Sequence, residues 1–185
     1  AHITAEIGER TISVLKGFPY VNEVWPRPTQ QGLSGKLRHL SRLRKAKFDL
    51  AVLLDDPNDL VLQEKLGGIP RRVGIWRGKK YESLFDAYVP YRREIHEVRN
   101  HGALVIQLLG GPLSSCAPCL FPSPEDISLA QDAIASLAGD GPLIGIHPGA
   151  SDPARRWNVS QLAETARLLR SAGARVVLVG GPADQ

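Results

Sequence analysis

The 185-residue sequence contains no methionine, only two cysteines and few aromatic residues, which amount to 6% of the chain. Without an initiator methionine near Ala1, we expect this chain to be a piece of a longer protein. No apolar run approaches the roughly 20 residues that a membrane-spanning helix requires. The first ten residues also lack the basic-then-apolar order of a secretory signal. These absences favour an intracellular protein.

The two cysteines, Cys116 and Cys119, form a C-x-x-C motif that could suggest redox or metal chemistry. No second cysteine pair is present to complete a zinc site. The motif also lies within the proline-rich stretch GGPLSSCAPCLFPSP rather than at a helix start after a strand, where thiolates are activated. The context therefore disfavours both roles.

The chain carries 23 basic and 19 acidic residues, a formal charge of +4 that favours an anionic partner. Nucleic acid, a phosphorylated sugar and a membrane surface all remain open on charge alone. Aromatic residues are not interleaved with the first basic cluster, which disfavours base stacking on single-stranded nucleic acid. The first basic cluster falls on an expected helix, and a basic helical face is usually only solvated. A basic face of this kind also suits an enzyme whose acceptor is an anionic lipid. The two basic clusters comprise Lys36, Arg38, Arg42, Arg44, Lys45 and Lys47, and then Arg71, Arg72, Arg77, Lys79 and Lys80.

Along the chain, predicted strands alternate with predicted helices, a pattern typical of an α/β fold. Near-continuous apolar runs such as FDLAVLLD are typical of parallel strands that are covered on both faces. We expect helices at residues 4–16, 34–45, 59–66, 97–109, 123 or 128 to 138, and 158–172. We expect strands at residues 20–26, 48–55, 71–76, 86–91 (an edge strand), 142–148 and 174–181.

Four prolines and two glycines between residues 110 and 124 separate two α/β patterns, so this segment is the predicted linker. The predicted domains are residues 1–111 and 125–185, joined by residues 112–124. In the second domain, the strands at residues 142–148 and 174–181 and the helix between them form a βαβ unit. Its helix starts at Asn158, with Gln161 placed for a capping box, and Gly173 is a natural stop.

The loop in IGIHPGASDPARRW follows a predicted strand, and ligands of parallel sheets bind beyond the carboxyl ends of strands. Small residues let a ligand approach the backbone, a helix start adds partial positive charge, and arginine donors match phosphate. The alternative is that Gly149 only makes the turn and the arginines are solvated, since no G-x-G-x-x-G or Walker pattern is present. The predicted donor-phosphate-binding residues are Gly149, Ala150, Ser151, Arg155, Arg156, Gly180 and Gly181.

The segment from Ile144 to Gln185 resembles the start of the nucleotide-binding domain of glycosyltransferase family 9, the lipopolysaccharide heptosyltransferases. The shared features are Pro-Gly-Ala, a basic residue with Trp, a helix, and a strand ending in Gly-Gly-Pro. The earlier FDLAVLLDD, KLGGIPRRVGIW and HEVRN look like the acceptor domain of that family. The resemblance implies a GT-B fold of two Rossmann-like parallel-sheet domains, the first lacking its first strand and the second truncated.

The resemblance implies transfer of heptose, or a related sugar, from an ADP-sugar to the lipopolysaccharide inner core, with inversion and without a cofactor or metal. Its partners would be the ADP-sugar donor and an anionic lipid-linked saccharide acceptor, with no nucleic acid. The implied location is the cytoplasm of a Gram-negative bacterium, with peripheral contact to the inner membrane through the basic helix at residues 34–47. Two alternatives remain: another GT-B nucleotide-sugar enzyme such as an epimerase, and a non-enzymatic basic module that binds nucleic acid.

The resemblance also implies roles for particular residues. Ser151 stands where the family places a hydroxyl near the donor phosphates, and Arg155 or Arg156 replaces a basic residue that is commonly lysine. The family's catalytic Asp lies in a Gly-Asp turn that would precede Ala1, so the catalytic residue is unknown, with Asp55 and Asp56 as the candidate carboxylates. We therefore expect these 185 residues alone not to transfer sugar.

Overall fold

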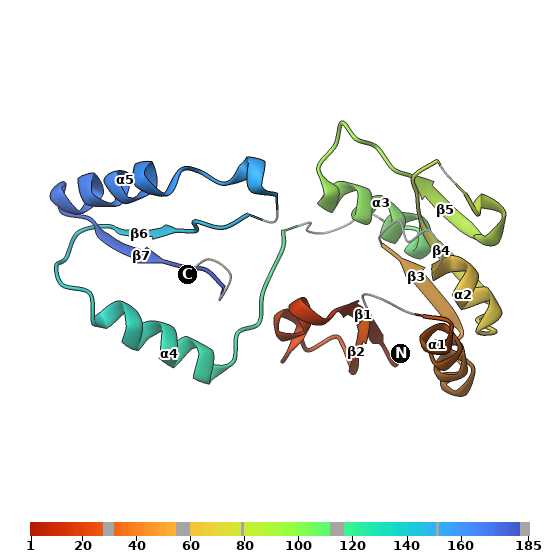
Figure 1. Ribbon diagram of the computed structural model, residues 1–185. Helices are drawn as coiled ribbons and strands as arrows, with labels where there is room; N and C mark the ends of the chain where they lie inside the picture. Colours follow the sequence, from red (N-terminus) through yellow and green to blue (C-terminus); the bar gives the residue numbers. More distant parts are fainter. Residues whose placement is uncertain (28–31, 55–59, 79, 112–116, 151, 182–185) are drawn as a thin grey trace. The chain divides into compact units, whose positions relative to one another are not determined.

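The computed structural model describes residues 1–27, 32–54, 60–78, 80–111, 117–150 and 152–181. The chain divides into two compact units, Ala1–Phe121 and Pro122–Gln185, each with its own parallel strands (Figure 1). The boundary between the units falls inside residues 112–124. The functional roles assigned to the two domains stay predictions. No helix in the described ranges is long and apolar enough to cross a membrane.

The first unit contains a two-stranded sheet of order β1-β2 and a three-stranded sheet of order β3-β4-β5, both parallel. The last strand, β5, is at the edge of its sheet as expected. The elements are β1 (Thr4–Gly8), a 3₁₀ helix (Glu9–Leu15), β2 (Glu23–Arg27), α1 (Leu33–Ala46), β3 (Leu50–Leu53), α2 (Leu60–Leu66), β4 (Arg71–Trp76), a 3₁₀ turn (Glu82–Leu84), β5 (Ala87–Pro90) and α3 (Glu97–Leu109).

The helix expected at residues 4–16 is wrong. Thr4–Gly8 forms strand β1 instead, and only the residues that follow it coil, into a 3₁₀ helix. The strand forms because β2 lies alongside it in parallel register, with Glu6 opposite Trp25. This pairing satisfies the backbone of a segment whose β-branched residues suit a strand, and it overrides the local helical pattern.

The core of the first unit lies on both faces of β4. Val73 and Ile75 are 1% exposed, and Leu104 of α3 is fully buried against them. The four consecutive residues 72–75 of β4 are all buried, so both faces of this strand are covered as expected. The same expectation is wrong for β3, where Leu50 and Val52 are exposed. Helix α3 packs against β4 and β5. It does not cover the face of β3 that carries Leu50 and Val52.

The second unit is a parallel βαβ arrangement preceded by a helix (Figure 1). Ser123 caps the first helix in a capping box with Asp126, so this helix begins at 124 and not at 128. The strand expected to be buried at residues 142–148 is shorter, and its side chains are half-buried or exposed. The elements are α4 (Pro124–Ala135), β6 (Leu143–Ile146), a 3₁₀ turn (Pro153–Arg155), α5 (Val159–Ser171) and β7 (Arg175–Leu178).

Helix α5 begins and ends where the sequence predicts. Asn158 is its N-cap, and the Asn158 side chain accepts a hydrogen bond from the backbone N–H of Ser160 at 2.9 Å. The prediction of a capping box between Asn158 and Gln161 is wrong, because the Asn158 side chain accepts from Ser160 instead. Gly173 follows the helix with a φ of +89°, a left-handed conformation that glycine adopts without strain.

Candidate functional site

The two strands of the second unit end side by side, so the loops that follow them leave the sheet next to each other. Ile146 lies opposite Leu178, and the Val179 N–H donates to the Ile146 carbonyl at 2.9 Å. Gly149 and Ala150 follow the first strand end, and Gly180 follows the second. The roots of the predicted phosphate-binding loops are therefore neighbours, at the carboxyl edge where parallel sheets bind ligands.

One contact that the sequence did not predict joins these loop roots. The imidazole Nδ1 of His147 lies 2.6 Å from the carbonyl oxygen of Val179, across the two strand ends. A lone histidine at a strand end gives no sequence signal for such a contact, because the partner is a backbone atom 32 residues away.

The two adjacent arginines of the loop are held differently. Arg156 donates from Nε to the Ala150 carbonyl at 2.9 Å, which folds the loop back on itself. Arg155 ends a 3₁₀ turn and is exposed, and its backbone N–H donates to the Asp152 carbonyl at 3.0 Å, while its side chain makes no hydrogen bond or ion pair with any residue that the structure describes. Asp152 caps this turn by accepting from the Ala154 N–H at 2.9 Å. Within the described part of the chain, the Arg155 guanidinium is therefore unpaired. Ser151 lies outside the described residues.

The loop does not lead directly into the start of α5. The 3₁₀ turn Pro153–Arg155 stands between the loop and α5, which begins only at Val159. The Ser160 N–H of α5 is already satisfied by Asn158. The partial positive charge of a helix N-terminus falls off within one turn. Positive charge near the loop therefore comes mainly from its side chains.

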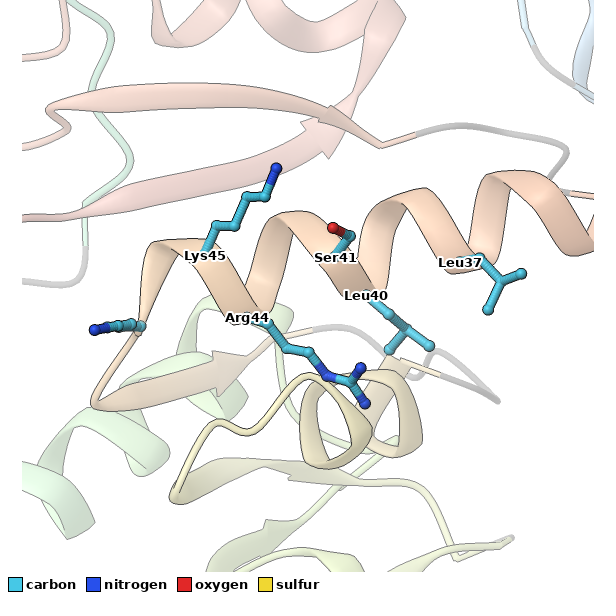
Figure 2. Close-up of a pocket in the computed structure, with 6 residues that line it drawn as sticks. Leu37, Leu40, Ser41, Arg44 and Lys45 are labelled. Carbon is cyan, nitrogen blue, oxygen red and sulfur yellow. The ribbon is translucent and has the colours of Figure 1, made fainter.

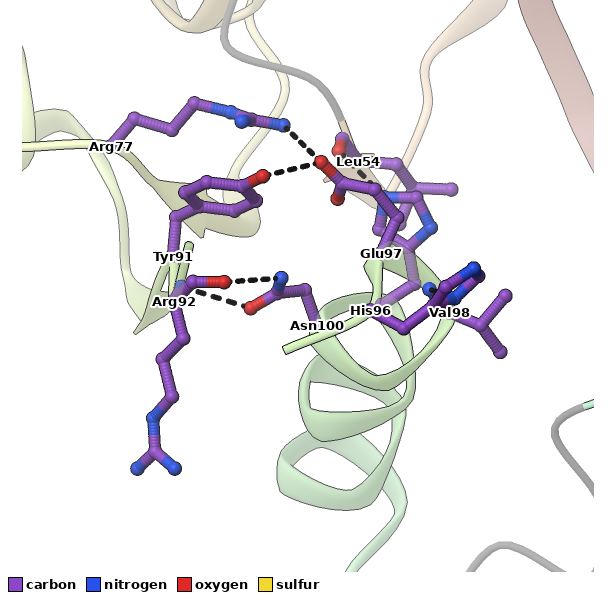
Figure 3. A network of polar contacts seen from close by, with 9 residues as sticks. Leu54, Arg77, Tyr91, Arg92, His96, Glu97, Val98 and Asn100 are labelled. Atoms are coloured by element: carbon purple, nitrogen blue, oxygen red, sulfur yellow. Dashed lines mark hydrogen bonds and ion pairs between the residues drawn. The ribbon is translucent and has the colours of Figure 1, made fainter. Parts of the chain in front are cut away.

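A second polar cluster lies at the carboxyl ends of the first unit's strands (Figure 3). Arg77 follows β4, Tyr91 follows β5, and Glu97 opens α3. The Tyr91 hydroxyl donates to Glu97 Oε1 at 2.6 Å, and Arg77 Nη2 lies 3.7 Å from the same oxygen. The Arg77 guanidinium also stacks 3.7 Å above the Tyr91 ring. The carboxylate and the ring together fix the direction of this arginine.

Helix α3 ties this edge together through two further residues. Asn100 is 2% exposed, accepts from the Arg92 N–H at 3.0 Å and donates to the Arg92 carbonyl at 2.9 Å (Figure 3). His101 Nε2 lies 3.1 Å from the Leu54 carbonyl, just beyond β3. Three strand ends are therefore fixed to one helix. Asp55 and Asp56, which come next in the chain, lie outside the described residues.

The basic helix α1 borders an open depression of about 540 Å³ (Figure 2). The depression runs along α1 from Leu37 to Lys47, the residue that follows the helix. Arg44 donates from Nε and Nη2 to the Leu66 carbonyl, at 3.2 and 3.0 Å. The depression is lined by Leu37, Leu40, Ser41, Arg44, Lys45 and Lys47.

Neither metal nor thiol chemistry gains support from the geometry. Among the described residues, no group of three His, Cys, Asp or Glu side chains is placed to hold a metal ion. Cys119 is an exposed free thiol, and Cys116 lies outside the described residues.

Residues 36–185 match glycosyltransferase family 9 (heptosyltransferase). Lipopolysaccharide heptosyltransferase 2 of Escherichia coli (strain K12) is 30% identical over 183 residues, which is 92% of this chain and 52% of that protein. Lipopolysaccharide heptosyltransferase 2 of Salmonella typhimurium is 33% identical, again over 92% of this chain and 52% of that protein. The chain thus spans about half the length of these relatives.

Two solved structures share the fold. The crystal structure of the glycosyl transferase family 9 from Veillonella parvula matches with a TM-score of 0.79 and 21% identity, over 99% of this chain and 54% of that one. The structure of E. coli ADP-heptose lps heptosyltransferase II matches with a TM-score of 0.74 and 26% identity, over 100% and 56% of the two chains. These likenesses confirm the α/β fold of the GT-B type.

Proposed function

Because the chain belongs to glycosyltransferase family 9, the heptosyltransferases, we propose that the protein transfers a sugar from a nucleotide donor. The donor is ADP-heptose or a related ADP-sugar, the acceptor is the inner core of lipopolysaccharide, and the anomeric carbon is inverted. One observation carries this proposal: two strand-end loops leave the sheet of the second unit side by side, and one of them carries Arg155, whose guanidinium has no partner among the described residues.

The donor half of the reaction needs charge stabilisation of a departing diphosphate. Arg155 is free to donate two parallel hydrogen bonds to a phosphate, the geometry that guanidinium and phosphate share. Arg156 holds the loop that carries Arg155, through the Ala150 carbonyl. Gly149 and Gly180, which have no side chains, allow the diphosphate to approach the backbone. Arginine and backbone N–H groups thus neutralise the diphosphate in this proposal, without a metal ion.

The acceptor half is assigned to the carboxyl edge of the first unit. Arg77 is fixed there by Glu97 and the Tyr91 ring, and its buried Nε has no hydrogen-bond partner in the described ranges. An oriented guanidinium at this edge suits an acceptor that carries phosphate or carboxylate groups. The base that deprotonates the acceptor hydroxyl is either a carboxylate from the family's Gly-Asp turn or one of Asp55 and Asp56, which follow β3.

Calorimetric titration of the protein with ADP and with adenosine tests the donor site. We expect Arg155→Ala to weaken ADP binding by about tenfold or more, because a charge-assisted contact with the phosphates is lost. Adenosine binding should be unchanged in that variant. Arg170→Ala, which removes a basic side chain from the last turn of α5, is the matched control. ADP binding that survives the combined loss of Arg155 and Arg156 would show that the diphosphate site is elsewhere.

Sugar transfer itself is followed in the full-length protein, as ADP release from ADP-heptose in the presence of truncated lipopolysaccharide. Arg77→Ala should raise the KM for the acceptor while leaving the KM for ADP-heptose unchanged. Arg71→Ala, at the opposite end of β4, is its control. An unchanged acceptor KM in Arg77→Ala would remove the first-unit edge from the proposal. Turnover that disappears in the double variant Asp55→Asn, Asp56→Asn would place the base on that loop.

We also propose that α1 contacts an anionic membrane surface. Leu33 and Leu37 are 77% and 58% exposed on the helix that carries Lys45. Exposed leucines beside basic residues suit the headgroup region of an anionic bilayer. The protein should sediment with phosphatidylglycerol vesicles more than with phosphatidylcholine vesicles, and Leu37→Glu with Lys45→Glu should abolish the difference. Equal sedimentation with both vesicles would refute the contact.

A further inference from the structure

The backbone hydrogen bonds between β6 and β7 follow the regular parallel pattern up to the strand ends. The Arg175 N–H donates to the Pro142 carbonyl at 2.9 Å, and the Val179 N–H donates to the Ile146 carbonyl at 2.9 Å. In a parallel pair the donor alternates between the strands every two residues. The next bond in this series would therefore run from the N–H of residue 148 to the Val179 carbonyl.

Residue 148 is a proline, which has no backbone N–H. The regular series therefore stops at Ile146, and the Val179 carbonyl has no backbone donor from the neighbouring strand. This interruption falls where the two loops of the donor site begin. Without another donor, nothing in the ladder would hold the start of Gly149–Ala150 to the start of Gly180.

The side chain of His147 supplies that donor. Its Nδ1 lies 2.6 Å from the Val179 carbonyl oxygen, the atom that Pro148 leaves without a partner. A carbonyl oxygen only accepts, so Nδ1 must carry the proton and donate. In the neutral ring this fixes the Nδ1–H tautomer and leaves Nε2 unprotonated. His147 therefore extends the β6-β7 hydrogen bonding by one step beyond the last backbone bond.

We propose that His147 is a positioning residue of the nucleotide-sugar site, which holds the roots of both donor loops at the spacing of the sheet. The inference rests on the proposed function for its ligand and on the His147–Val179 contact for its geometry. His147 does not touch the reacting atoms in this account. Its loss lets the two loops separate, so the backbone N–H groups no longer converge on one diphosphate.

Two substitutions separate a positioning role from a merely structural one. His147→Leu keeps much of the side-chain volume but removes the donor. His147→Asn returns an N–H close to the position of Nδ1, because the asparagine amide is attached at the same distance from the backbone. We expect ADP affinity to fall by about three- to tenfold in His147→Leu, as for the loss of one hydrogen bond. It should return to within about twofold of wild type in His147→Asn, and His2→Leu, in the first unit, should have no effect.

Nitrogen NMR of the histidine-labelled protein measures the geometry without any ligand. We expect the His147 ring to carry its proton on Nδ1, with a hydrogen-bond coupling to the Val179 carbonyl that persists in His2→Leu. A neutral ring protonated only on Nε2 would overturn the inference whatever the ADP results are. Equal ADP affinity in wild type and His147→Leu would also overturn it, with the proposed function intact.

Three remaining outcomes are equally decisive. If the wild-type protein binds no ADP, the proposed donor site fails, and the role of His147 in that site fails with it. If His147→Leu is unfolded by circular dichroism, His147→Asn carries the test, because affinity within twofold of wild type then supports the inference. A folded His147→Asn that binds ADP as weakly as a variant lacking Arg155 would contradict it.

Discussion

Both units contain parallel strands joined by helices, yet they differ in how many of their side chains are buried. In the first unit, Val73, Ile75 and Leu104 are at most 1% exposed and form a dry core on β4. In the second, none of the described residues is buried. The same local pattern of strand, helix and strand is therefore packed into a core in the first unit, and is not buried in the part of the second unit that the structure describes.

The difference follows from the number of neighbours that a strand has. β4 pairs with a strand at each edge, and α3 packs on the face that carries Val73 and Ile75. Among the described strands, β6 and β7 pair only with each other. Their arrangement therefore depends more on backbone hydrogen bonds and less on buried side chains than that of β4. Arg175 Nε donates to the Gly141 carbonyl at 3.0 Å at one end of this pair, and His147 joins the strands at the other. The contacts of the first unit are mainly between buried apolar side chains. Those described in the second unit are mainly hydrogen bonds to the backbone.

The largest expected effect comes from the core of the first unit. Leu104→Ala should lower the free energy of unfolding by about 3 kcal/mol, because it leaves a cavity beside Val73 and Ile75. Leu168→Ala on α5 is the matched change in the second unit, where the side chain is 55% exposed. It should cost less than about 0.5 kcal/mol. Denaturant unfolding with hydrogen exchange resolved by segment measures both. Equal losses would contradict the contrast in burial between the units.

A smaller effect tests the backbone contacts of the second unit. A Cβ at Gly141 would lie 1.8 Å from the Gly173 carbonyl oxygen, so Gly141→Ala should destabilise the β6-β7 pair by about 2 kcal/mol. Gly145, in the middle of β6, has open space where a Cβ would be. Gly145→Ala should therefore be neutral or stabilising by up to about 1 kcal/mol. Hydrogen exchange of the β7 amides reports on both variants, and similar protection in the two would contradict the close approach at Gly141.

The smallest expected effect concerns a carboxyl group in each unit. Burial, together with the nearby charge of Glu6, raises the pKa of Glu64 to about 8. The folded state then holds this proton more tightly than the unfolded state, so stability falls as the pH rises from about 4.5 to about 8. Glu64→Gln should remove this loss and gain on the order of 1 kcal/mol at pH 8 relative to pH 5, measured by denaturant unfolding.

Glu164 in the second unit is the matched comparison. Its hydrogen bonds to Arg167 lower the pKa of its carboxyl group, so any stabilisation is present above the unfolded pKa and is lost as the pH falls. Glu164→Gln should therefore change the pH dependence in the opposite direction to Glu64→Gln. The same direction in both variants would show that burial does not distinguish the two carboxyl groups.

Much of the architecture was predictable because the relevant interactions are local. Helix α3 occupies residues 97–109 as expected, and β4 spans the predicted RRVGIW. The segment at residues 4–16 was misjudged because its strand depends on β2, which begins 15 residues after β1 ends. No local periodicity carries that information.

The candidate site divides in the same way. The strand-end loop with Arg155 and Arg156 was visible in the sequence, because a strand, a small-residue turn and two arginines are consecutive. The different tasks of the two arginines were not visible, since they depend on where the Ala150 carbonyl points. The cluster of Arg77, Tyr91 and Glu97 was missed because its members come from three separate elements.

The sequence by itself determined the order of strands and helices after β1, the start of α5 at Asn158, and the family resemblance of the strand-end loop. These depend on side chains and backbone groups a few residues apart. Only the tertiary structure decided which strand faces are buried, and that His147 donates where Pro148 cannot. Burial and cross-strand hydrogen bonds join residues distant in the chain, so they exist only once the strands lie side by side.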